Sequence, residues 1–274
     1  MVSVLDRIGP IGFGEDDGLK CLIYGKSGSG KTTLWATFPG PILVAICSGG
    51  DNPGELRSID TPEYRDKVKR VVLSQAGELL ELVGAVSRLG FATVVLDHAT
   101  GFQDMVLKEI LGLSEIPAQK SWGLASQQQY GQCTMQCKDY LRALFGLNCN
   151  VVLVAQERDF KPEGESELSI LPSVGAGLTP SLAGWVYTAA DYILQTYLRP
   201  REVVKKVKQG EKVIELKRTD GVEFCLRTGP DPIYTTKFRV PKGTSLPHSL
   251  VDPDYGKIRG LVRGEGRKLV SSTK

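Results

Sequence analysis

The sequence lacks the features of membrane and secreted proteins. No apolar run approaches the ~20 residues that a membrane-spanning helix needs, and no secretory signal peptide opens the chain. It also has no C-x-x-C pair, and its two histidines form no cluster with metal-ligand spacing. We therefore expect a cytoplasmic protein with no membrane partner.

The cysteines are scattered and lie mostly inside apolar runs. Cys133 and Cys137 are one helical turn apart and could share a metal, but no histidine cluster joins them. Buried free thiols in a reducing compartment are the favoured interpretation. The six cysteines are Cys21, Cys47, Cys133, Cys137, Cys149 and Cys225.

The chain also has little net charge. The 34 Lys and Arg residues against 31 Asp and Glu residues give a net charge of +3, so any basic surface for nucleic acid must be local. A composition of 41% apolar and 24% charged residues is ordinary for a soluble globular protein. At 274 residues we expect one large domain, or one domain with an appendage.

What the sequence does contain is a complete phosphate-binding loop. Residues 25–32 read Gly-Lys-Ser-Gly-Ser-Gly-Lys-Thr and fit G-x-x-x-x-G-K-[ST]. An apolar run at 19–24 precedes the loop and predicts a buried strand, and residues 33–38 read as a helix start. A Gly/Ser turn with a chance lysine is the alternative, which this strand–loop–helix context disfavours. The residues predicted to bind the nucleotide are Gly25, Lys26, Ser27, Gly28, Ser29, Gly30, Lys31, Thr32 and Thr33.

The loop implies ATP and Mg²⁺ as ligands. Lys31 is expected to place its charge on the β- and γ-phosphates, and Thr32 its hydroxyl on Mg²⁺. Asp97 closes the apolar run 93–97, where its carboxylate can reach the metal through water. A cap on the following helix is the alternative role for Asp97.

Two further predicted strands separate the loop from Asp97 in sequence. This favours the NTPases that insert a strand into the sheet and use an added polar group to position water. Gln156 ends the next apolar run and is the candidate sensor of the γ-phosphate. A buried glutamine with a structural hydrogen bond is the alternative.

Apolar runs alternate with amphipathic segments over the first two-thirds of the chain. The predicted strands are 19–24, 42–47, 68–73, 93–97 and 151–156, and the predicted helices are 77–89, 101–112 and 124–146. This pattern predicts an α/β fold with a mostly parallel sheet covered by helices on both faces.

After about residue 191 the pattern changes to shorter alternation. Runs at 192–198, 213–217, 222–227 and 234–240, with turn signals at 209–210, 220–221 and 229–230, predict an antiparallel β extension. We divide the chain into a lead-in at 1–18, a core at 19–198, a β extension with a basic hairpin at 199–245 and a basic flexible tail at 246–274.

Several strand ends resemble those of RecA-type recombinases. Residues 71–75 end in Ser-Gln, a helix follows, and residues 94–99 contain the aspartate. Residues 152–156, a polar loop, 175–177 and 190–193 resemble the sensor strand, DNA-binding loop and following strand of that family. The likeness spans roughly 20–200 and is strongest for the core-only RecA-like ATPases that bacteriophages encode beside single-strand annealing functions. It implies a RecA-like P-loop ATPase core and, for a phage protein, the host cytoplasm.

Two features depart from that family. RecA proteins carry a catalytic glutamate after the second strand, where this chain has Cys-Ser-Gly-Gly-Asp at 47–51. Asp51 or Glu55 is the expected substitute, and hydrolysis is expected to be slow. No N-terminal oligomerisation segment stands out.

Lys237 and Arg239 flank Phe238 in the predicted strand 234–240. Alternation along a strand would point both cations to one face. RecA-type and ring-helicase ATPases use such a Lys-x-Arg pair to reach the γ-phosphate of the neighbouring subunit, which implies a homo-oligomer, either a filament or a ring. An exposed strand edge with two charges is the alternative.

Three segments are candidates for nucleic acid. Lys120 and Trp122 pair a cation with an aromatic ring where the resemblance places a first DNA loop. Arg158 and Lys161 begin a polar loop that corresponds to the second. A basic segment at 199–218 reads as a hairpin that could contact phosphates. The lysines singled out in it are Lys205, Lys206 and Lys208. A solvated loop is the alternative for each.

Together these features favour an ATP-dependent, single-stranded-DNA-binding RecA-like recombinase or annealing protein of phage type. Its ATPase activity is expected to respond to DNA, and a single-strand DNA-binding protein is a conceivable second partner. The alternatives are a ring helicase or packaging motor, and a regulatory NTPase that binds no DNA.

Overall fold

The computed structural model describes residues 18–47, 56–113, 125–160, 173–209 and 212–265. For residues 204–209 and 212–218 it describes the backbone alone.

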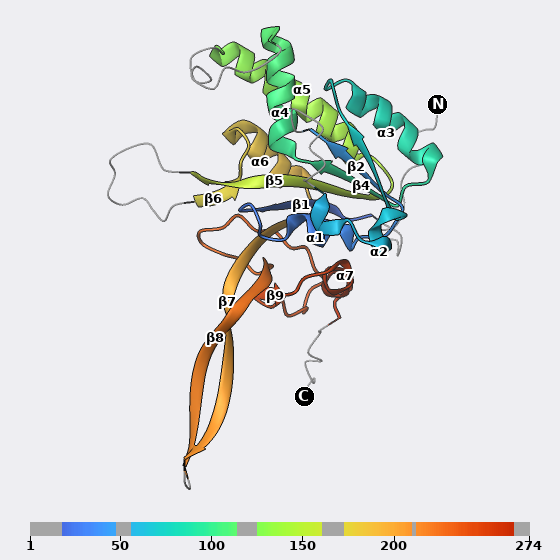
Figure 1. Cartoon of the computed structure of the whole chain (residues 1–274). Coiled ribbons are helices and arrows are strands. Elements are labelled where there is room, and N and C mark those ends of the chain that lie inside the picture. The colour runs from blue at the N-terminus through green and yellow to red at the C-terminus, as the bar shows by residue number, and fades with distance from the viewer. Residues whose placement is uncertain (1–17, 48–55, 114–124, 161–172, 210–211, 266–274) are drawn as a thin grey trace, which may run out of the picture.

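The described strands form one mixed sheet in the order β3-β2-β4-β5-β1-β7-β8-β9, with β6 paired to β5 (Figure 1). Strands β1, β2, β3, β4, β5 and β7 are parallel, and the pairs β5–β6, β7–β8 and β8–β9 are antiparallel. The strands are β1 (Lys20–Gly25), β2 (Ile42–Ile46), β3 (Val68–Val72), β4 (Thr93–Asp97), β5 (Asn150–Phe160), β6 (Ser173–Ala176), β7 (Tyr192–Gln209), β8 (Lys212–Arg227) and β9 (Ser249–Val251).

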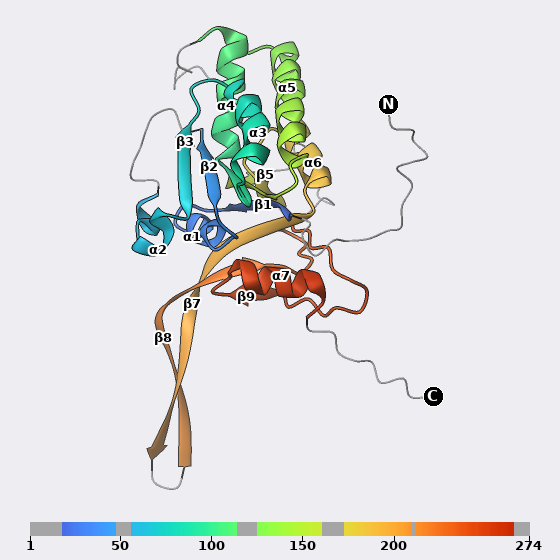
Figure 2. The ribbon, with the colours of Figure 1, turned by 90° about the vertical axis from the view of Figure 1, so that its right-hand side faces the viewer.

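Helices cover both faces of this sheet, as the continuous apolar strands predict. The larger core lies between the sheet and α3 to α6, and the second core lies between the sheet and α1, η2 and α7 (Figure 2). The helices are α1 (Lys31–Ala36), η2 (Arg57–Ile59), α2 (Pro62–Arg65), α3 (Glu78–Leu89), α4 (Ala99–Leu111), α5 (Gln127–Phe145), α6 (Pro180–Ala189) and α7 (Tyr255–Arg263). None of the described helices has both the length and the apolar character that crossing a membrane requires.

Strand β5 lies between β1, which precedes the phosphate loop, and β4, which ends at Asp97. The inserted strand that the sequence predicts is therefore confirmed. With helices on both faces and an antiparallel extension at β7 to β9, the chain has a RecA-like P-loop NTPase core. Because the strands are parallel, the phosphate loop, Asp97 and the outer half of β5 meet at one edge of the sheet.

Strands β7 and β8 are far longer than predicted and form one hairpin that projects from the core (Figures 1 and 2). We call residues 199–209 and 212–223 the arm. The turn expected at 220–221 does not form. Pro200 pairs with Val222 and Glu202 with Thr219, so Gly221 (φ 79°) lies in a β-bulge where β8 has an extra residue.

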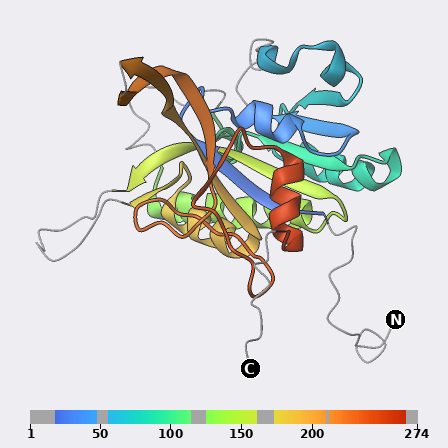
Figure 3. The ribbon, with the colours of Figure 1, turned by 90° about the horizontal axis from the view of Figure 1, so that it is seen from below.

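Two predictions for the C-terminal part are wrong. The strand expected at 234–240 is absent, and only isolated bridges form at Tyr234 and Lys237. The tail expected from 246 instead contains β9 and α7. Helix α7 packs on the sheet through the fully buried Ile258, and the Tyr255 ring lies 4.9 Å from that of Phe38. Figure 3 shows α7 on the near side of the sheet, with the green and yellow helices α5 and α6 behind it.

Candidate nucleotide-binding site

The phosphate loop depends on glycine at defined positions. Gly25 ends β1 between Gln156 of β5 and Thr196 of β7. A Cβ atom on Gly25 would lie 2.4 Å from both the carbonyl and the hydroxyl oxygen of Thr196. Gly28 (φ 76°) and Gly30 (φ 88°) adopt left-handed conformations that favour glycine. The motif glycines are thus required by close packing at one position and by backbone geometry at two.

Ser29 anchors the loop to the neighbouring strand. Its side chain is buried, and its Oγ lies 2.8 Å from the Lys26 carbonyl oxygen and 2.6 Å from the Thr196 Oγ1. The Thr196 hydroxyl in turn lies 3.3 Å from the Tyr24 carbonyl oxygen. Sequence reasoning missed Thr196, because only the β1–β7 register brings it to the loop.

Lys31 is 9% exposed and folds back onto its own loop. Its Nζ donates to the carbonyl oxygens of Gly25 (2.9 Å) and Lys26 (2.8 Å). Burial lowers the pKa of Lys31, and the carboxylates of Asp97 and Glu157 oppose that shift. Within the described residues no carboxylate forms an ion pair with Lys31.

Within the described part of the chain, the space beside the loop is open. A Cβ atom on Gly28 would meet nothing within 4 Å, and Lys26, Ser27 and Gly28 are exposed. A buried cation with no ion pair among the described residues, next to exposed loop residues, fits a phosphate chain as its counter-ion.

Asp97 faces the site from the end of β4. The indole N–H of Trp35 donates to its Oδ2 at 3.3 Å and orients the carboxylate. The capping role considered for Asp97 belongs to His98, whose Nδ1 accepts from the Gly101 amide at 2.9 Å. Thr32 and Asp97 supply the hydroxyl and carboxylate oxygens that Mg²⁺ prefers, so this donor set fits the ion.

Gln156 lies beside the loop, in register with Gly25. Its carbonyl oxygen accepts from the Gly177 amide at 2.7 Å, and the Gly177 carbonyl accepts from the Thr100 hydroxyl at 2.8 Å. Among the described residues no hydrogen bond engages the side-chain amide of Gln156. The structural hydrogen bond considered for this side chain is therefore not seen there, and the sensor role stays a prediction.

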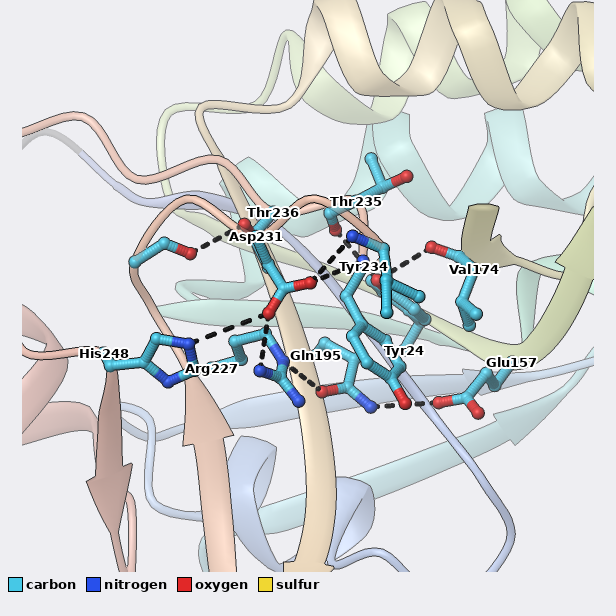
Figure 4. Close-up of polar contacts among 12 residues, drawn as sticks. Tyr24, Glu157, Val174, Gln195, Arg227, Asp231, Tyr234, Thr235, Thr236 and His248 are labelled. Atoms are coloured by element: carbon cyan, nitrogen blue, oxygen red, sulfur yellow. Dashed lines mark hydrogen bonds and ion pairs between the residues drawn. The ribbon is translucent and has the colours of Figure 1, made fainter. Parts of the chain in front are cut away.

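A polar chain crosses the sheet next to the loop (Figure 4). Gln195 of β7 donates from Nε2 to Glu157 Oε2 of β5 at 3.0 Å and accepts at Oε1 from Arg227 Nε of β8 at 3.2 Å. Arg227 also pairs with Asp231 at 2.7 Å, and the side chains of this pair are 12% and 8% exposed. Sequence reasoning missed this chain, which connects Glu157, in the outer half of β5, to the base of the arm.

Aromatic rings enclose the same arginine. The Arg227 guanidinium lies 4.8 Å from the ring centroid of Tyr197 and 4.2 Å from that of Tyr234. Burial disfavours the charged form of Asp231, but the amides of Tyr234 and Ile233 and the Arg227 charge outweigh burial and lower the pKa of its carboxyl group. The base of the arm is therefore a charged, hydrogen-bonded junction.

Lys237 and Arg239 lie near the amino ends of the parallel strands, whereas the phosphate loop lies at their carboxyl ends. Lys237 Nζ donates to the carbonyl oxygens at the end of α6, at 2.9 Å from Tyr187 and 2.6 Å from Ala190. Arg239 pairs with Asp191, just before β7, at 2.5 Å. The alternation argument for these cations is wrong, because they do not lie on a strand. Their intersubunit role stays a prediction.

The remaining predicted residues are placed only in part. Arg158 is exposed on the β5–β6 hairpin, with its guanidinium 5.7 Å from the Phe160 ring centroid. The residues outside the described part of the chain are Asp51, Glu55, Lys120, Trp122 and Lys161. The arm residues described by their backbone alone are Lys205, Lys206 and Lys208.

Comparison with known proteins adds one family. The model of the AAA_24 family, an AAA domain, matches residues 17–224. No curated protein matches the chain.

Two solved structures are similar in fold. A KaiC-like protein of the archaeon Pyrococcus horikoshii has 11% identity over 76% of this chain and 85% of its own, with a TM-score of 0.39. The flagellar accessory protein FlaH of Methanocaldococcus jannaschii has 10% identity over 77% of each chain, with a TM-score of 0.39.

Proposed function

The chain belongs to the AAA domain family, whose model covers most of its length, and from that premise we propose that it is a Mg²⁺-dependent ATPase that couples ATP to single-stranded DNA. The observation that carries the nucleotide part is the phosphate loop. It places the buried Lys31 cation, which has no ion pair among the described residues, beside an exposed glycine-rich backbone. The negative charge of Asp97 acts on Lys31 and favours its charged form.

Each residue has a separate task in this proposal. Lys31 leaves the loop carbonyls and donates to the β- and γ-phosphates, while Thr32 and Asp97 hold the ion. Mg²⁺, when bound, neutralises charge on the phosphate oxygens. Gln156 orients the attacking water from the neighbouring strand. Asp51 or Glu55 is proposed to activate that water.

The arm supports the DNA part of the proposal. Residues 199–223, which span the arm, contain eight Lys and Arg against five Asp and Glu, a net charge of +3. Since the whole chain carries +3, the rest of the protein carries no net charge. The positive charge is thus concentrated in and around one projecting hairpin, as a phosphate-contacting element requires. The β5–β6 hairpin, with Arg158, leaves the same edge of the sheet.

The polar chain offers a route for coupling. Glu157 follows the proposed sensor Gln156 directly, and Gln195 links it to Arg227 at the base of the arm. A change at the γ-phosphate that moves Gln156 and Glu157 would alter the contacts of Gln195 and Arg227 at the base of the arm. ATP would then favour one arrangement of the DNA-contacting hairpins through differential contacts.

We further propose a homo-oligomer of the phage recombinase or annealing type. Lys237 and Arg239 lie at the edge opposite this chain's own phosphate loop, so only a head-to-tail neighbour could bring such cations to a nucleotide. This arrangement would place ATP between subunits. A single-strand DNA-binding protein is a proposed further partner.

The test is ATP turnover with and without single-stranded DNA, together with particle shape by electron microscopy. We expect slow turnover that single-stranded DNA accelerates, and filaments or rings formed with ATP. Duplex unwinding by closed rings would instead support a helicase or packaging motor. Turnover indifferent to DNA, with no salt-sensitive DNA binding, would overturn the DNA part and support a regulatory NTPase.

A further inference from the structure

An exposed apolar patch lies at the base of the arm. Leu198, Val222 and Phe224 are 44%, 53% and 42% exposed. Leu198 pairs with Phe224 in the β7–β8 register, and Pro200 pairs with Val222. Side chains alternate between the faces of a strand, and Leu226, two residues after Phe224, is buried in the core that contains α1. The three patch residues and Pro200 therefore share the α1 face of the sheet.

Phe224 forms a wall of the phosphate loop. A Cβ atom on Gly30 would lie 2.9 Å from Cδ1 and 3.5 Å from Cε1 of the Phe224 ring. Gly30 is the residue before Lys31 and immediately precedes α1. The ring thus packs against the loop backbone while 42% of the residue faces solvent. Solvent exposure of a large ring beside a ligand loop leaves room for a flat apolar group on it.

The strand order gives the direction in which a nucleotide must lie. Strand β1 has β5 and β4 on one side and β7 and β8 on the other. Gln156 of β5, the residue proposed to sense the γ-phosphate, pairs with Gly25, and Asp97, proposed for the ion, ends β4. The loop amides hold the α- and β-phosphates. With its γ-phosphate toward β5 and β4, a nucleoside triphosphate directs its nucleoside toward β7 and β8, where the patch lies.

We infer that this patch receives the nucleobase of the bound nucleotide, with the Phe224 ring as its stacking surface. This inference rests on the proposed ATP site and names the part of the ligand that the phosphate motif does not specify. A nucleobase presents two flat π-faces, and stacking on an aromatic side chain tolerates any base while favouring the larger purines. Leu198 and Val222 extend the apolar surface beyond the ring.

The test separates the base from the phosphates. Calorimetry measures the Kd of the magnesium complexes of ATP and inorganic tripolyphosphate for wild type, Phe224→Ala and Phe224→Leu. We expect Phe224→Ala to weaken ATP about tenfold while leaving tripolyphosphate unchanged. Phe224→Leu keeps apolar bulk without a π-face, so its Kd for ATP should lie between those of wild type and Phe224→Ala. ATP and GTP should lose more affinity than CTP and UTP.

The control is Met135→Ala, which removes a 68% exposed apolar side chain on α5 and should change neither Kd. Equal weakening of ATP and tripolyphosphate would mean that Phe224 only shapes the loop through Gly30, which overturns the inference. The inference is also overturned if Phe224→Ala abolishes self-association, measured by light scattering, while the ratio of the Kd values for ATP and tripolyphosphate stays unchanged. That result would mean that a second copy of the chain covers the patch. If wild type binds neither ligand, the proposed ATP site itself is wrong.

Discussion

The phosphate loop and the arm are held in place by opposite means. The loop is fixed by contacts with the buried core, because Ser29 is buried against Thr196 and Gly25 admits no side chain. The arm is a two-stranded ribbon whose strands pair at ten register positions. Isolated two-stranded hairpins are marginally stable in water, so the arm depends on its base.

The loop is therefore rigid, whereas the arm extends far from the core. A rigid loop can present amides and a cation to phosphate at little conformational cost when ligand binds. A projecting ribbon instead exposes positive charge far from the core, where an extended polyanion can meet it. Gln195, Arg227 and Asp231 form the junction between the loop and the arm, so a structural change in one region can alter the other through these contacts.

The largest expected effect comes from breaking that junction. Arg227→Ala removes the nearest cation from the Asp231 carboxylate and the donor from the Gln195 amide oxygen. The more exposed His248, 3.7 Å from Asp231, is then the only other charged partner among the described residues. Removing one partner of a buried pair destabilises proteins by about 3–5 kcal/mol. Chemical denaturation should therefore show a loss of that size, and the arm and the loop should both be affected.

The control for this variant is Arg142→Ala. Arg142 pairs with Asp139 at 2.6 Å, but both side chains are mostly exposed, at 65% and 73%. Exposed pairs contribute about 0–1 kcal/mol. Equal losses from Arg227→Ala and Arg142→Ala would contradict the claim that the junction is a buried structural element.

Lys31→Ala should disable the loop and spare the arm. Losing the charged contact to the β- and γ-phosphates should weaken ATP by about 3 kcal/mol, or about a hundredfold in Kd. The unfolding temperature without nucleotide should hardly change, because Lys31 is a buried cation with no ion pair among the described residues. Calorimetry checks the first expectation and thermal unfolding the second.

The exposed Lys69 on β3 supplies the matched control, and Lys69→Ala should leave ATP affinity unchanged. Unaltered ATP affinity in Lys31→Ala would refute the assignment of the loop.

The sequence predicts the loop well and the arm poorly, for a physical reason. The loop motif spans eight residues, and the contacts of Lys31 reach only six residues back, so a local pattern encodes them. The Ser29–Thr196 contact joins residues 167 apart and appears only with the strand order and register. Phe224 and Glu157 reach the site through the same long-range pairing and carry no motif.

Some local sequence signals led to wrong predictions because two different local conformations satisfy them equally well. Asp220-Gly221 reads as a turn, but a glycine with positive φ serves a β-bulge as well, and the bulge lets two strands continue as one ribbon. Helix α7 contains Gly256 and Gly260, which have low helix propensity, and packing of Ile258 against the core compensates. Tertiary contacts decided both outcomes.

Charge reversal on the arm should do the opposite of Lys31→Ala. The triple variant Lys205→Glu, Lys206→Glu and Lys208→Glu should keep ATP affinity but lose phosphate contacts to single-stranded DNA. Each lost contact lowers the slope of log K against log salt by about 0.7, so the slope should fall by about 2. Fluorescence anisotropy with labelled single-stranded DNA across a salt series measures it.

Reversal of three exposed cations away from the arm makes the same change in net charge. Lys69→Glu, Arg88→Glu and Lys242→Glu serve this purpose, since all three side chains are exposed and lie outside the arm. If both triples reduced the slope equally, DNA binding would follow net charge alone, and the arm would have no special part in it.

The smallest expected effect compares one substitution in both regions. Gly30→Ala and Gly221→Ala both force alanine into a left-handed conformation, at φ 88° and 79°, which costs about 1–2 kcal/mol. At Gly30 the new methyl also meets the Phe224 ring at 2.9 Å, whereas at Gly221 no described atom lies within 4 Å. Denaturation should therefore rank Gly30→Ala below Gly221→Ala in stability, and only Gly30→Ala should weaken ATP. Gly221→Asn should recover most of the loss, because asparagine tolerates this conformation, and a failure to recover it would place the cost outside the backbone.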